Sequence, residues 1–312
     1  MKLSQVVPTA QGQIIFEIYL PKKTYKRNER ERSRRAVDFN LRFMTWCLGL
    51  DFRGLKTFMK CYVLSSFMDF NIKKPTHILA LLVLLIAFFM IIISPILSFF
   101  GVFSSLETSM VELTESVIVM SSLITVLILI VTSCIWYLLV NRCSIREMLY
   151  NLKLRSEGID TAFLWGILAA VAMFIIVMIL GSIFVVLGFG GEDLSNIDSF
   201  AGISITSMFF IIVVQSVGEE IFFRGFLLEK IESLSGPNMA IFATAILFGL
   251  AHMSYGKLYP VLMPMVMGIL LGFIVVKTRN LYAAIIAHMA FNFISFILYL
   301  FAQSLVPEAL IL

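Results

Sequence analysis

The chain has 312 residues, of which 60% are hydrophobic and 14% charged, and its mean hydropathy is +0.96. Soluble domains carry about 25% charged residues, so this composition excludes an ordinary soluble globular protein. The formal net charge is +4. We expect an integral membrane protein with membrane lipid as a partner and without a nucleic-acid partner.

Apolar stretches recur along the chain after residue 75. Each is long enough, or nearly so, to cross a hydrocarbon core about 30 Å thick as a helix rising about 1.5 Å per residue. They cover residues 78–100, 116–140, 161–187, 201–228, 238–255, 260–276 and 281–303. We therefore predict an all-α fold, a polytopic transmembrane helical bundle with about seven spans.

The distribution of basic residues predicts the orientation of these spans. Most Lys and Arg residues precede Pro75, and the link 141–160 carries four more, whereas the links 101–115 and 188–200 carry none. Loops rich in Lys and Arg stay in the cytoplasm. The N-terminus is therefore predicted to be cytoplasmic and the C-terminus outside, in what we expect to be a bacterial plasma membrane.

Three regions follow from this pattern. Residues 1–75 form a cytoplasmic segment whose basic run, from Lys22 to Arg35, is typical either of a surface attracted to anionic lipid or of a tail that sets topology. Basic residues at helical spacing around residues 53–60 predict a helix lying in the membrane interface. Residues 76–200 read as a transmembrane scaffold, and residues 201–305 as a second transmembrane core.

Three ionisable side chains, Glu219, Glu220 and Arg224, lie within an apolar stretch of this core. Each charge at bilayer depth costs roughly 3 kcal/mol, so such a cluster indicates function. Glu220 and Arg224 are one helical turn apart and can pair, while Glu219 points about a quarter turn away. We expect Glu220 to be structural and Glu219 to be free for chemistry.

Two histidines and an amide follow in later apolar stretches. His252 lies four residues after Phe248, and Asn292 lies one turn after His288 on the same helix face. If the residues around Gly236 reverse the chain, Glu219 and His252 lie almost equally far from that turn and become level. The sequence therefore predicts one site built from several helices.

This set of side chains fits two kinds of chemistry. A carboxylate beside an imidazole can hold and deprotonate a water, and a second imidazole and an amide can stabilise an oxyanion. Alternatively, Glu219, His252 and His288 form the two-histidine, one-glutamate ligand set of catalytic zinc. The sequence leaves open whether the cofactor is Zn²⁺ or whether there is none.

The motifs Glu219-Glu220-xxx-Arg224, Phe248-xxx-His252 and His288-xxx-Asn292 together resemble those of the CPBP intramembrane proteases, which include CAAX-processing endopeptidases and the Abi-like group. The resemblance covers roughly residues 201–303. It implies a CAAX-endopeptidase-like core and a hydrolase, either a metalloprotease or a glutamate protease, that cuts membrane-associated or prenylated peptide and protein substrates.

The resemblance also implies a role for each motif residue. Glu219 and His252 would activate the water, and His288 and Asn292 would form the oxyanion hole. The supporting residues would be Glu220, Arg224 and Phe248.

Other functions remain open at this stage. A non-catalytic membrane scaffold or an immunity protein could keep the motifs without using them. An ion-coupled carrier also uses buried Glu and His, but we would expect its carboxylates on several spans, whereas here they are adjacent on one.

Overall fold

The computed structural model describes residues 7–8, 14–15, 69–102, 114–188, 203–253 and 258–305. The chain forms two compact units, Met1–Lys60 and Cys61–Leu312. In the first unit, strand β1 (Val7–Pro8) pairs antiparallel with β2 (Ile14–Ile15). The basic run and the interfacial helix predicted from the sequence lie outside the described residues. The predicted division between a scaffold and a catalytic core falls within the second unit and stays a prediction.

The described part of the second unit is helical. Its helices are α3 (Pro75–Phe88), η1 (Phe89–Ile93), α4 (Ser94–Phe99), α5 (Glu115–Leu139), α6 (Ile145–Asn151), α7 (Ile159–Val186), α8 (Ile205–Glu220), η3 (Ile221–Leu227), α9 (Leu228–Leu250), α10 (Tyr259–Thr278) and α11 (Tyr282–Leu305). Among the described residues, six helical segments are long and apolar enough to cross a membrane. The predicted all-α polytopic fold is confirmed.

The longest of these segments, Ile205–Leu250, is a helical hairpin. The Arg224 guanidinium carbon lies 4.1 Å from the centroid of the Phe248 ring, although a continuous helix would hold these residues about 36 Å apart. The chain reverses at Gly236, whose φ of 82° and ψ of 170° break the helix. Glycine suits this position because a side chain disfavours positive φ. The expected spans 201–228 and 238–255 are the two arms of this hairpin, and they count as one of the six segments.

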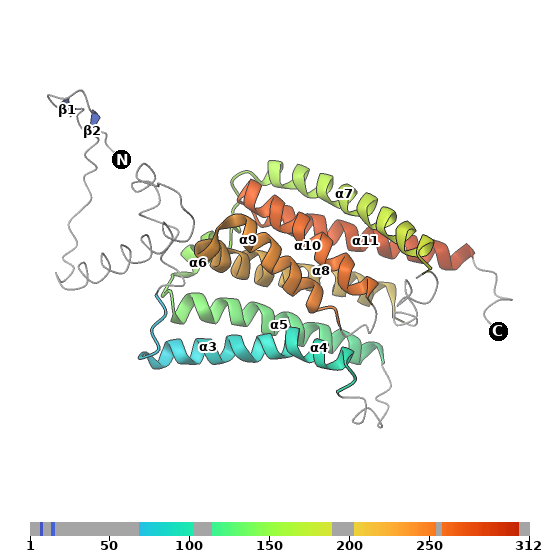
Figure 1. Ribbon diagram of the computed structural model, residues 1–312, viewed down its shortest axis with the longest axis horizontal. Coiled ribbons are helices and arrows are strands. Elements are labelled where there is room, and N and C mark those ends of the chain that lie inside the picture. The colour runs from blue at the N-terminus through green and yellow to red at the C-terminus, as the bar shows by residue number, and fades with distance from the viewer. Residues whose placement is uncertain are drawn as a thin grey trace. The chain divides into compact units, whose positions relative to one another are not determined.

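The hairpin lies in the middle of the bundle. In Figure 1, α8, α9 and α10 lie between the pair formed by α3 and α5 and the pair formed by α7 and α11. Helix α5 packs against α3 and α8, and α11 packs against α7, α8 and α10. Helices α9 and α10 approach closely at Gly249. A Cβ at this position would lie only 2.8 Å from the Val261 carbonyl oxygen of α10, so the absence of a side chain permits the approach. Side chains on the inward faces of this middle layer are buried, as Glu220 and Arg224 are, whereas outward-facing side chains such as Phe242 stay exposed.

A polar network fixes the point where α11 begins. The Arg279 guanidinium lies 2.7 Å from the Glu232 carboxylate, and the Lys153 ammonium lies 3.7 Å from its other oxygen. Burial lowers the pKa of Lys153 from its usual value, and Glu232 offsets only part of this effect. The Asn280 amide donates to two carbonyls of the loop between α6 and α7, at 3.0 and 3.2 Å. These contacts set the depth of α11, and with it the depth of His288.

Candidate active site

The two adjacent glutamates lie where the helix type changes. Helix α8 ends at Glu220, and the next turns, Ile221–Leu227, form the π-helix η3. A π-helical turn inside a helix is rare and occurs frequently at functional sites. The sequence interpretation assumed a regular α-helix here, and no local residue pattern signalled the change. At Gly225, a Cβ would lie 3.0 Å from a Leu152 methyl carbon, so glycine lets this segment pack closely.

Glu220 and Arg224 form a fully buried ion pair. A guanidinium nitrogen of Arg224 lies 2.9 Å from Glu220 Oε1, and both side chains are 0% exposed. The guanidinium also lies over the Phe248 ring of α9, which contributes a cation–π contact. Phe248 therefore supports the pair from the second arm of the hairpin.

His288 of α11 lies between the two carboxylates. Its Nδ1 is 2.9 Å from Glu220 Oε1, and its Nε2 is 3.9 Å from Glu219 Oε2. Because a carboxylate oxygen accepts, Nδ1 carries a hydrogen and donates to Glu220. The His288 side chain is only 7% exposed. The structure thus brings His288 together with both glutamates.

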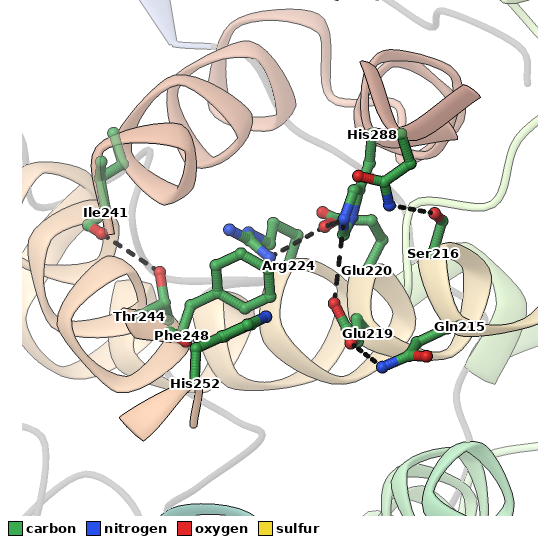
Figure 2. Close-up of polar contacts among 11 residues, drawn as sticks. Gln215, Ser216, Glu219, Glu220, Arg224, Ile241, Thr244, Phe248, His252 and His288 are labelled. Atoms are coloured by element: carbon green, nitrogen blue, oxygen red, sulfur yellow. Dashed lines mark hydrogen bonds and ion pairs between the residues drawn. The ribbon is translucent and has the colours of Figure 1, made fainter. Parts of the chain in front are cut away.

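His252 follows α9 and faces the same region. Its Nδ1 lies 2.7 Å from the Phe248 carbonyl oxygen, so Nδ1 donates and the lone pair of a neutral ring resides on Nε2. Its ring packs against Phe248 with the centroids 4.9 Å apart. Glu219 is near enough to act on His252 electrostatically, and Figure 2 shows the imidazole directed toward the Glu219 side of the cluster.

Two further residues contact the site from the preceding turn of α8. The Gln215 amide nitrogen donates to Glu219 Oε1 at 3.0 Å, and the Asn292 amide nitrogen donates to Ser216 Oγ at 3.4 Å. Figure 2 shows Gln215 and Ser216 beside the two glutamates. Sequence reasoning missed both residues, although Gln215 precedes Glu219 by one helical turn, as Ser216 precedes Glu220. That spacing was the available signal.

The zinc ligand set was one of two alternatives that the sequence left open. Among the described residues, no group of three or more His, Cys, Asp and Glu side chains is placed to hold a metal ion. Nδ1 of His288 faces Glu220 and Nδ1 of His252 faces a backbone carbonyl, so these bonds by themselves leave Nε2 of each ring able to act as a ligand, and the placement of the three side chains decides the question. As placed here, the Glu219, His252 and His288 side chains do not converge on one metal position.

Fold and site together define the class of protein: an integral membrane protein whose buried carboxylates and imidazoles converge from α8, the end of α9 and α11. Residues 201–294 match the family model described as type II CAAX prenyl endopeptidase Rce1-like. The match confirms the resemblance to the CPBP family for this part of the chain, and it contains all seven residues that the motifs singled out. It supports a protease of the CAAX type. No curated protein and no solved structure matches the chain.

Proposed function

We propose that the protein is an intramembrane endopeptidase that hydrolyses peptide bonds of membrane-associated or prenylated substrates, with Glu219 as the general base. One observation carries the proposal: His288 of α11 lies within 3.9 Å of both Glu219 and Glu220 of α8. All three residues fall within the part of the chain that matches the family model. Glu220 is neutralised by Arg224, whereas Glu219 faces imidazoles and an amide. A buried carboxylate in such surroundings suits proton transfer.

In the proposed reaction, Glu219 takes a proton from water while the water oxygen attacks the peptide carbonyl carbon. Nε2 of His252 accepts the other water hydrogen and so orients the nucleophile. The carbonyl π electrons move to its oxygen and form an oxyanion. Glu219 then returns its proton to the amide nitrogen as the C–N bond breaks. The products are a carboxylic acid and an amine.

His288 and Asn292 stabilise the oxyanion in this scheme. Nδ1 of His288 donates to Glu220, so Nε2 donates as well only when the ring carries both protons. The charges of Glu219, Glu220, Arg224 and a doubly protonated His288 then sum to zero, which reduces the cost of burying them together. The Asn292 amide donates one hydrogen to Ser216 and has a second for the oxyanion.

Glu219→Gln tests the proposal, because it preserves the size of the side chain and removes the base. Loss of a general base costs roughly two to four orders of magnitude in rate. We expect peptide termini produced by wild-type cells to disappear in cells that carry Glu219→Gln, as measured by comparative proteomics of membrane and secreted peptides. The matched control is Glu147→Gln, which alters an exposed glutamate at the start of α6.

The protein must also accumulate in the membrane to the wild-type level in both variants. If no peptide changes its terminus, and Glu219→Gln rescues the phenotype of a deletion, then the protein acts as a scaffold and the proposal is wrong.

A further inference from the structure

The carboxylate of Glu219 is held unevenly at its two oxygens. Oε1 accepts from the Gln215 amide at 3.0 Å, and Oε2 lies 3.9 Å from His288 Nε2. Gln215 precedes Glu219 by four residues on α8 and is half-buried. The contact therefore occupies one oxygen and leaves the other directed toward α11.

This division matters because a glutamate has three rotatable bonds and can present either oxygen to a substrate. The ion-pair contact of His288 Nε2 with Glu219 Oε2, at 3.9 Å, is longer than the contact of Gln215 with Oε1 and holds the carboxylate less tightly. Glu220 is bound by Arg224, and His288 gives its short contact to Glu220 rather than to Glu219. Among the hydrogen bonds of the described residues, Gln215 supplies the short contact that restrains Glu219.

We propose that Gln215 is a positioning residue for Glu219: its amide holds Oε1, so that Oε2 is the oxygen that takes the proton from water. This inference rests on the proposed function, because it assigns a role to the oxygen of the base. Gln215 itself touches neither water nor peptide in this scheme. It acts by orientation, and orientation of the reacting groups contributes strongly to rate.

Gln215→Met tests the role, because methionine has nearly the same length and shape and cannot donate the hydrogen bond. With a peptide identified by the Glu219→Gln comparison as substrate, we expect kcat to fall about tenfold to a hundredfold. KM should change by less than about twofold, since Gln215 contributes nothing to substrate binding. Val214→Ala is the matched control, because it trims a half-buried neighbour on the same turn and should leave both constants near wild type.

The same substitution made in a second variant, one that already lacks the Glu219 carboxylate, separates a positioning role of Gln215 from a general structural effect. Glu219→Ala removes the carboxylate, so no contact with Gln215 is left to break. Adding Gln215→Met to Glu219→Ala should then lower the residual kcat by less than about twofold, because coupled residues do not act additively. A merely structural role for Gln215 would instead give the same loss in both backgrounds.

The outcomes distinguish this inference from the proposed function. If Glu219→Gln retains wild-type activity, both fail. If Glu219→Gln is inactive while Gln215→Met has wild-type kcat, or loses as much in the Glu219→Ala background as alone, the positioning role is wrong and the proposed function stands.

Discussion

Glu220→Gln should destabilise the protein, because it leaves Arg224 as a buried charge without its carboxylate. Removing one partner of a buried ion pair costs roughly 3–5 kcal/mol. Both side chains are 0% exposed, so water cannot reduce this cost. The glutamine oxygen can still accept one hydrogen bond, and the contact of Arg224 with Phe248 persists. We therefore expect the lower end of the range, about 3 kcal/mol, which is more than a hundredfold in the unfolding equilibrium.

The measurement is unfolding of the purified protein in mixed micelles at increasing fractions of denaturing detergent, followed by tryptophan fluorescence. Glu147→Gln, at an exposed glutamate, is the control and should unfold like wild type. The double variant Glu220→Gln/Arg224→Met replaces the charged pair by neutral side chains of similar size. It should recover about 2 kcal/mol or more, because uncharged replacements of a buried pair are often neutral in stability.

The double variant should still be inactive, because His288 loses the charged acceptor of its Nδ1 hydrogen. Two results would refute the reasoning. One is a Glu220→Gln variant that unfolds within about 0.5 kcal/mol of wild type, which is the scatter of substitutions away from sensitive sites. The other is a double variant whose loss of unfolding free energy equals the sum of the losses in Glu220→Gln and in Arg224→Met. That result would mean that the two residues are not coupled.

Two other predictions concern the metal and the topology. Exhaustive chelation of the purified enzyme should leave cleavage unchanged, because Glu219, His252 and His288 do not form a shared ligand set; loss of activity that Zn²⁺ restores and Mg²⁺ does not would contradict this. Reporter fusions should be cytoplasmic after Lys153 and outside after Leu312, because basic residues concentrate in the link 141–160; a cytoplasmic signal after Leu312 would contradict the predicted orientation.

Much of the bundle could be predicted from composition and turn chemistry. Apolar stretches of membrane-spanning length are a strong signal, because backbone polar groups in lipid must be satisfied within a helix. The reversal at Gly236 was also predictable, since glycine followed by proline interrupts helices. The same reversal brings Arg224 into contact with Phe248, a pairing that we did not predict.

The details of the site could not be predicted, because they depend on packing between distant segments. The π-helix η3 alters the direction of side chains after Glu220 without any local residue signal. The bond from His288 to Glu220 depends on the depth of α11, which the Asn280 and Glu232 contacts set. A contact such as that of Gln215 could have been proposed from its spacing, but only as one candidate among many pairs four residues apart.

The placement of acidic groups bears on the choice between hydrolysis and ion transport. In the described membrane-spanning segments, Glu219 and Glu220 lie side by side near the middle of the bundle. The other acidic residues of these segments lie near helix ends or near the reversal. Glu115 and Asp160 lie in the first turns of α5 and α7, and Glu229 and Glu232 lie in the first turns of α9, where Glu229 pairs with Lys230 at 2.8 Å. A carrier passes its ion between groups spaced along a path. A hydrolase needs one base held at one point, and the contacts of Gln215, Arg224 and His288 hold the two glutamates in that way. The arrangement therefore favours hydrolysis over transport.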